Sequence, residues 1–218
     1  MTVSAANAGC FWWSHDIGGF QDVTKSDELY VRWVQFGAVS AALRLHMCGE
    51  ENFDRRPWTW GEQACGVMRE MFRLRSRLFP YIYSSAYRSA KEALPLLKPM
   101  YYENPETEEA YRYPDQYYFG PDMIASPVTE KGAGQDCTAE KEIYLPDGIW
   151  YDWFSGARFA GSTTVTVSSP LETFPLFVRG NAGIVSQPYT NRMASSSLRE
   201  LIVTVFDGGE GTHTTFLY

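Results

Sequence analysis

The chain has 218 residues, enough for one large domain or two modest ones with a hydrophobic core. Its formal net charge of −7 argues against a nucleic acid as a partner, because binding phosphates requires clustered Lys and Arg. Crossing a membrane takes about 18 consecutive apolar residues or more, and no run is that long, so we predict no membrane segment. The four cysteines have neither C-x-x-C nor zinc-ligand spacing, and we predict no metal and no cofactor.

The first informative segment lies near the N-terminus. Residues 10–13 are apolar and aromatic and predict a short buried strand, which ends at the polar pair His15-Asp16. Gly18 and Gly19 follow and allow a sharp turn. A strand that presents a carboxylate at its C-terminal tip is typical of the active-site end of a (β/α)₈ barrel.

A second strand–helix unit follows. Residues 29–41 carry apolar side chains at helical spacing, after a candidate capping box from Thr24 to Asp27. Residues 42–46 predict a strand whose end carries Arg44 and His46. Residues 61–93 are the strongest helical pattern, which Pro80 is expected to kink or to split in two.

After Pro95 the pattern changes to short strand-like runs separated by turn residues, which predicts an antiparallel β-sandwich. The near alternation in the tyrosine-rich residues 111–119 favours a strand with one buried face over a sugar-binding platform. A further strand pair is predicted at 201–205 and 214–218. The predicted strands before that pair are residues 123–128, 142–145, 149–154, 163–167 and 174–179.

Taken in order, the short motifs resemble family 31 of the glycoside hydrolases, the α-glucosidases and α-xylosidases. The motifs are WSHDIGGF at 13–20, RW at 32–33, RLH at 44–46, PW at 57–58, FPYIY at 79–83, KPM at 98–100, FGPDMIASPV at 119–128, LPDGIW at 145–150 and FPLFVRG at 174–180.

The resemblance implies an α/β part followed by an all-β part. Residues 1–94 are expected to form the C-terminal part of the (β/α)₈ catalytic barrel, residues 95–187 the proximal C-terminal β-sandwich, and residues 188–218 the start of a distal C-terminal β-domain. Two strand–helix units cannot close a barrel, because closure needs eight strands and about 250 residues. We therefore expect this chain to be a piece that lacks sequence at both ends, and its cellular location stays open.

The resemblance also implies an activity, the retaining hydrolysis of α-glucosides or α-xylosides, with an α-linked oligosaccharide as the binding partner. In the family, two aspartates act as nucleophile and as acid/base, and both are expected upstream of Met1. The chain alone is thus expected to be inactive. Two alternatives stay open: a non-catalytic carbohydrate-binding protein or degenerate fragment, and an α-glucan lyase.

Five residues of the chain are candidates for the substrate site. By resemblance, Asp16 and His46 contact the sugar at the non-reducing end; a carboxylate accepts two hydroxyl groups and a neutral imidazole accepts or donates one bond. Arg44 is expected to hold Asp16 through a bidentate ion pair. Phe20 matches an aromatic residue that lines the site near the scissile bond, and Trp13 is expected to support that wall from below.

The same residues also admit plainer roles. Asp16 could cap a helix, His46 could be a satisfied core histidine, and His15 is expected to pack behind the strand. A metal site built from these three side chains is the least favoured alternative. Three acidic residues of the following loop are expected to be solvated or structural: Glu50, Glu51 and Asp54.

Overall fold

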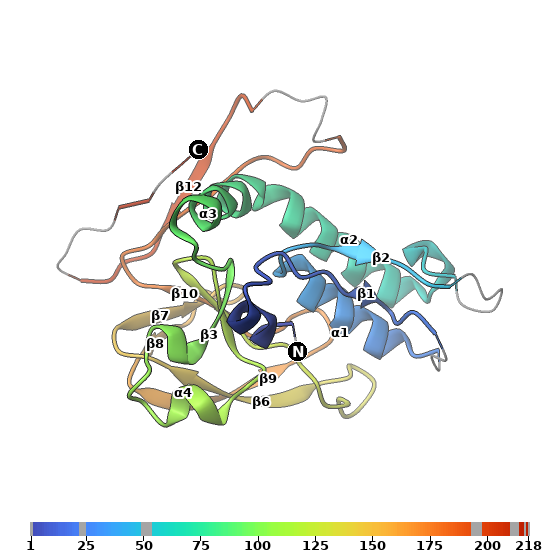
Figure 1. Cartoon of the computed structure of the whole chain (residues 1–218). Helices are drawn as coiled ribbons and strands as arrows, with labels where there is room; N and C mark the ends of the chain where they lie inside the picture. The colour runs from blue at the N-terminus through green and yellow to red at the C-terminus, as the bar shows by residue number, and fades with distance from the viewer. Residues whose placement is uncertain are drawn as a thin grey trace.

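A computed structural model describes residues 2–21, 25–48, 54–192, 198–209, 214–215 and 217 of the chain. Three long helices lie on one side and antiparallel strands on the other, with the short N-terminal 3₁₀ helix between them (Figure 1). Strand β12 (Ile202–Val205), near the C-terminus, lies at the opposite end of the molecule from the first two strands.

The first strand–helix unit is present but short. Strand β1 (Asp16–Ile17) pairs in parallel with β2 (Arg44–Leu45), so Asp16 lies directly opposite Arg44. Helix α1 (Asp27–Ala38) connects them, and the Ser26 hydroxyl caps it by accepting a bond from the Leu29 amide at 3.3 Å. Thr24, the first residue of the expected capping box, lies outside the described residues.

The prediction of a buried strand at residues 10–13 is wrong. The chain forms a 3₁₀ helix (Ser4–Ala8) and then irregular backbone up to residue 15, with Trp12 49% exposed. The parallel pairing of β1 with β2 covers two residue pairs only, so no ladder extends to this aromatic run. The apolar composition was therefore a poor guide to strand formation here.

The long helical pattern is split in two, as Pro80 predicted. Helix α2 (Glu62–Arg77) ends at Leu78, and α3 (Phe79–Glu92) begins there with Pro80 in its first turn. Proline is tolerated in a first turn because its missing N–H would have no partner inside the helix. Met68, Met71 and Leu74 of α2 belong to the buried cluster that includes α1.

Among the described residues, the strands of the second half are antiparallel. The largest sheet has the order β3-β4-β5-β10-β7-β8, β6 pairs with β9, and β11 pairs with β12. These strands are β3 (Leu97–Pro99), β4 (Tyr117–Phe119), β5 (Met123–Ala125), β6 (Ala139–Leu145), β7 (Ile149–Asp152), β8 (Arg158–Ala160), β9 (Thr163–Ser169), β10 (Leu176–Arg179), β11 (Gly183–Ser186) and β12 (Ile202–Val205). The remaining short helices are the 3₁₀ helices Pro57–Thr59 and Met100–Tyr102 and helix α4 (Glu109–Arg112).

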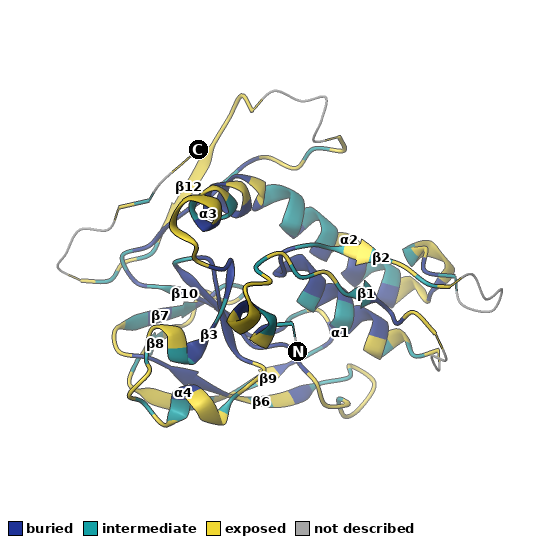
Figure 2. Ribbon diagram, viewed as in Figure 1, coloured by how far each residue is buried: buried dark blue, intermediate teal, exposed yellow. Residues whose placement is uncertain are grey.

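Three adjacent strands of the six-stranded sheet, β4, β5 and β10, are buried on both faces, whereas the edge strand β8 is partly exposed (Figure 2). Alternate side chains of these three strands enter two different cores, as the pleat requires. Tyr118, Ile124 and Phe177 pack against Ile143 and Leu145 of the β6–β9 ribbon. The neighbouring side chains face the helices instead, in one core with α1, α2 and α3: Tyr117, Phe119, Met123, Ala125, Leu176 and Val178.

The tyrosine-rich segment does not behave as one unit. Tyr117, Tyr118 and Phe119 form β4 and are fully buried, whereas Tyr111 lies on α4 and is 55% exposed. The prediction that one face of a strand is buried is thus wrong in detail, because both faces of β4 are covered. The strand expected at 214–218 lies largely outside the described residues.

Hydrogen bonds from long polar side chains join the helices to the sheet. Tyr117 of β4 donates to the Val39 carbonyl at the end of α1 (2.9 Å). Arg75 of α2 donates to the nearby carbonyls of Gly37, Ala38, Ser40 and Ala41 at 2.7–3.2 Å. Burial lowers the pKa of Arg75 to about 10, so the guanidinium stays charged at neutral pH. These bonds satisfy carbonyls that the C-terminus of a helix leaves without partners.

We expect Tyr117→Phe to lower the free energy of unfolding by about 1–2 kcal/mol, because it leaves the buried Val39 carbonyl without this donor. Urea unfolding measures the change. Tyr111→Phe is the matched control. The Tyr111 side chain is exposed and its hydroxyl donates to the Pro105 carbonyl, so this exchange should lower the free energy of unfolding by less than about 0.5 kcal/mol. Equal effects of the two exchanges would contradict the prediction.

Candidate functional site

The candidate site lies where the chain leaves β1 and β2. After Asp16–Ile17 the backbone turns through Gly18 and Gly19, whose φ angles of +90° and +88° favour glycine. The Gly19 amide closes the turn on the Asp16 carbonyl at 2.8 Å. The Cys48 amide, beyond β2, bonds the Phe20 carbonyl at 3.1 Å, so the segments that follow the two strands are joined.

Asp16 and Arg44 form an ion pair at the strand ends. The contact joins Nη2 of Arg44 to Oδ1 of Asp16, so it is made by one nitrogen and one oxygen rather than by the two parallel bonds that we predicted. The Arg44 side chain is 55% exposed and that of Asp16 is 22% exposed. Because α1 is capped by Ser26, the structure offers no support for Asp16 as a helix cap.

Phe20 and His46 form a second pair, in the segments that follow β1 and β2. Their ring centroids are 5.4 Å apart with the rings tilted by 33°, and both residues are exposed. The alternative of a buried core histidine at position 46 is therefore wrong. The site thus combines a carboxylate, a guanidinium, an imidazole and an aromatic ring, all at the ends of two adjacent parallel strands.

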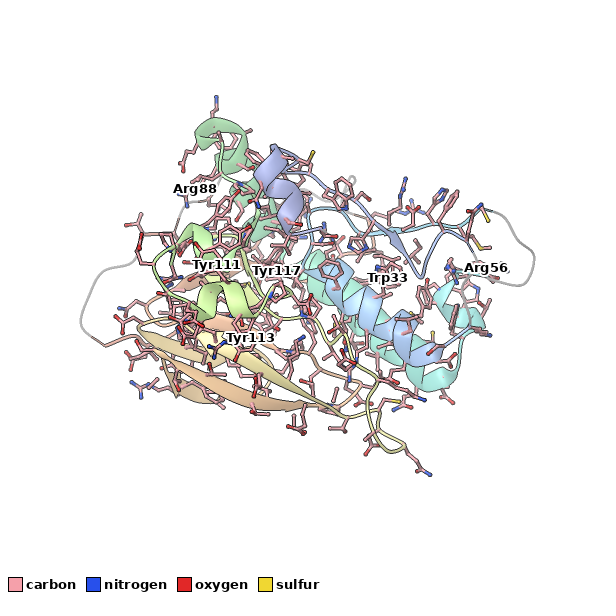
Figure 3. All side chains as sticks on the ribbon, turned by 60° about the horizontal axis from the view of Figure 1, so that its bottom comes forward. Trp33, Arg56, Arg88, Tyr111, Tyr113 and Tyr117 are labelled. Atoms are coloured by element: carbon pink, nitrogen blue, oxygen red, sulfur yellow. The ribbon has the colours of Figure 1, made fainter. Side chains whose placement is uncertain are left out.

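Trp13 lies on a cavity whose lining includes none of these four side chains. Its volume is about 580 Å³, and it is also lined by His15 and by Trp33 and Phe36 of α1. His15 stacks on Phe36 with ring centroids 4.6 Å apart, and its Nδ1 accepts a bond from Nε1 of Trp33 at 2.8 Å. Figure 3 labels Trp33 on α1. The expectation that His15 packs behind the strand is confirmed.

The buried environment of His15 makes stability depend on pH. Burial lowers the pKa of His15 below its ordinary value of 6.5, although the charge of Asp16 acts in the opposite direction. The unfolded chain therefore takes up a proton at pH values where the folded chain does not. This histidine destabilises the folded state as the pH falls below about 6.5, until the folded form also protonates.

When the pH is lowered from 7.5 to 5, we expect the wild type to lose more free energy of unfolding than His15→Phe. Phenylalanine keeps the stack on Phe36 and binds no proton. Urea unfolding of both proteins at several pH values measures this difference. A difference that does not vary with pH would contradict the prediction.

Arg55 is a residue of the site that the sequence analysis missed. It is buried, and its Nη2 donates to the Gly19 carbonyl at 2.9 Å. The Tyr30 hydroxyl of α1 donates in turn to the Arg55 carbonyl. The sequence shows two adjacent arginines, Arg55 and Arg56, before Pro57. Nothing in this polar segment indicates which of the two is buried.

The acidic residues of this segment have other roles or lie outside the description. Asp54 pairs with Arg56, whose bonds lower the pKa of the Asp54 carboxyl. Glu50 and Glu51 lie outside the described residues. Within the described ranges, no group of three His, Cys, Asp or Glu side chains could hold a metal ion, and no helix is long and apolar enough to cross a membrane.

Comparison with known proteins gives two adjacent family matches. Residues 1–85 match the TIM-barrel domain of glycosyl hydrolases family 31, and residues 93–184 match the C-terminal domain of glycosyl hydrolase family 31. Both matches fall on the parts that the resemblance predicted.

Individual relatives agree with these matches. A 1,6-alpha-glucosyltransferase of Sporosarcina globispora is 31% identical over the whole chain, and an alpha-xylosidase of Saccharolobus solfataricus is 34% identical over 80% of it. A family 31 dextranase of Flavobacterium johnsoniae, solved in complex with glucose, superposes with a TM-score of 0.88 at 30% identity over 95% of the chain.

The chain spans 17%, 24% and 25% of the lengths of these three proteins. The matches nevertheless cover the barrel part and the C-terminal part in the expected order, with a shared fold. The chain therefore belongs to glycoside hydrolase family 31.

Proposed function

We propose that this chain is the part of a retaining α-glycosidase that supplies the wall of the sugar site at the last two strands of the barrel. The observation that supports this most directly is that Asp16 pairs with Arg44 across the two parallel strands and that Phe20 packs on His46 just beyond their C-terminal ends. In a (β/α)₈ barrel this end of the strands carries the active site.

The four side chains suit a sugar ring chemically. An ionised Asp16 accepts bonds from two hydroxyl groups, and an exposed His46 accepts or donates one. The Phe20 ring, 44% exposed, offers an apolar face. Arg44 orients the Asp16 carboxylate without covering it, since the contact uses one of its two oxygens.

The reaction we infer is hydrolysis with retention at the anomeric carbon, in which one carboxylate attacks and a second acts first as acid and then as base. Both carboxylates are expected on strands other than the two described here, so the chain alone is expected to be inactive. Relatives solved with glucose and with isomaltotriose, and relatives described as alpha-xylosidases, support α-linked glucosides or xylosides as the substrate class.

We also infer the domain organisation. The family matches end at residue 85 and begin again at 93, which supports a barrel part at 1–94 and a proximal β-sandwich at 95–187. The shared core between the six-stranded sheet and the β6–β9 ribbon supports the sandwich. The distal domain from residue 188 is inferred from the resemblance alone, since β12 pairs with β11 of the preceding part.

The test is a saccharide titration of the chain followed by NMR. Glucose, xylose and isomaltotriose are added separately, and we expect at least one of them to shift the resonances of Asp16, Phe20 and His46. Nitrophenyl α-glucoside and α-xyloside, tested in parallel, should not be hydrolysed above background. Binding elsewhere on the chain, or hydrolysis by the chain alone, would overturn the proposal. Sequencing the native transcript beyond both ends then tests for the two aspartates.

A further inference from the structure

The turn after β1 is held from the side by a buried arginine. Gly18 and Gly19 have left-handed backbone angles, which glycine adopts without a steric penalty. A Cβ atom on Gly18 would lie 2.7 Å from Nε of Arg55 and 2.9 Å from Cε2 of Tyr30. The glycine therefore allows Arg55 and Tyr30 to approach the turn closely.

Arg55 makes this approach with a directed bond. Its Nη2 donates to the Gly19 carbonyl at 2.9 Å, and its guanidinium lies 5.8 Å from the centre of the Tyr30 ring. A charged donor on a buried carbonyl is a stronger contact than a hydrogen bond between neutral groups. The residue next along the chain from this carbonyl is Phe20, one of the candidate sugar contacts.

Arg55 is itself held through its backbone by Tyr30 of α1. The Tyr30 hydroxyl donates to the Arg55 carbonyl, and the Tyr30 ring packs on Trp60 with centroids 4.4 Å apart. All three side chains are buried, at 1% to 7% exposure. Burial is the largest cause that raises the pKa of Tyr30, to about 12, so its hydroxyl remains a donor at neutral pH.

We propose that Arg55 is a positioning residue for the sugar site: by binding the Gly19 carbonyl it fixes the turn that carries Phe20 beside His46, and it connects this turn to α1. Arg55 itself does not contact the sugar. The assignment rests on the proposed function where it concerns affinity. Where it concerns the Phe20–His46 contact, it rests only on the geometry of the turn.

The test compares Arg55→Met with Arg56→Met in the full 218-residue chain. Both exchanges remove a guanidinium and keep the unbranched stem, but Arg56 is bonded to Asp54 on the surface and not to the turn. Two quantities are measured by NMR: the cross-peaks between the Phe20 and His46 rings, and the dissociation constant for the saccharide that the wild type binds.

We expect Arg55→Met to lose the cross-peaks and to weaken saccharide binding at least tenfold, and Arg56→Met to change neither. Arg55→Lys, which keeps a charged donor, should restore part of both. Retention of the cross-peaks in Arg55→Met would overturn the assignment. A wild type that binds no saccharide would overturn the proposed function. The Phe20–His46 cross-peaks would then still test whether Arg55 positions the turn. If Arg55→Met does not fold, Tyr30→Phe removes the anchoring bond and decides by the same readouts.

Discussion

Arg32→Met is expected to lower the free energy of unfolding by about 3–5 kcal/mol, because it removes a buried charge that holds two parts of the chain together. Arg32 lies on α1 and is 5% exposed. Its Nη1 donates to the carbonyls of Pro170 and Thr173 at 3.1 and 2.7 Å. Its Nη2 donates to the carbonyls of Cys137 and Ser169 at 2.9 and 2.8 Å.

The large expected effect follows from what the exchange leaves behind. Methionine fills much of the same volume but has no donor, so four backbone carbonyls lose a charge-assisted bond. The neighbouring Gln35 keeps only its own bond to the Leu171 carbonyl at 2.7 Å and its longer one to Thr173 at 3.3 Å, which do not replace the lost donors.

Urea unfolding measures the loss, with Arg69→Met as the control. Arg69 lies on α2, and its side chain is 62% exposed with a contact of 3.9 Å to Glu70, so its removal should cost less than about 0.5 kcal/mol. Arg32→Lys should recover little of the stability, because one ammonium cannot reach four carbonyls on separate segments. Wild-type stability in Arg32→Met would show that the segment at 169–173 is held by other contacts.

Helical periodicity was the most reliable guide to this fold. The apolar spacing of residues 61–93 and the position of Pro80 were sufficient to predict α2 and α3, because helix formation depends on residues close in sequence. The short strands were harder to predict. Strands β3, β4 and β8 have three residues each, too few for a period of two to be recognised.

The site was predictable only in part, for a related reason. Asp16, Arg44 and His46 stand out because they lie at the ends of predicted strands, whereas Phe20 was assigned only through the family resemblance; the structure brings the four together in two pairs. Arg55 was missed because its partner is a backbone carbonyl 36 residues away, a contact that no spacing rule indicates. Trp13 has a signal of the same kind as Phe20, yet lies with α1.

The second large effect concerns Asp16. In the active enzyme that the proposed function implies, Asp16→Asn is expected to lower kcat/KM by about 10²–10⁴-fold. The proposed role assigns two sugar hydroxyl groups to this carboxylate, and a hydrogen bond to a charged group contributes about 1.5–3 kcal/mol, while each factor of ten corresponds to about 1.36 kcal/mol. Asparagine keeps the shape but has no charge and one acceptor oxygen.

Stability should change little, and this separates a role in binding from a role in folding. The ion pair of Asp16 with Arg44 lies at the surface, where such pairs contribute about 0–1 kcal/mol. Asp54→Asn is the matched control, since Asp54 is also paired with an exposed arginine but lies outside the four-residue site. Unfolding midpoints and kcat/KM are measured for both variants. If Asp16→Asn and Asp54→Asn had the same kcat/KM, Asp16 would not belong to the sugar site. If Asp16→Asn lost stability together with activity, Asp16 would have a structural role.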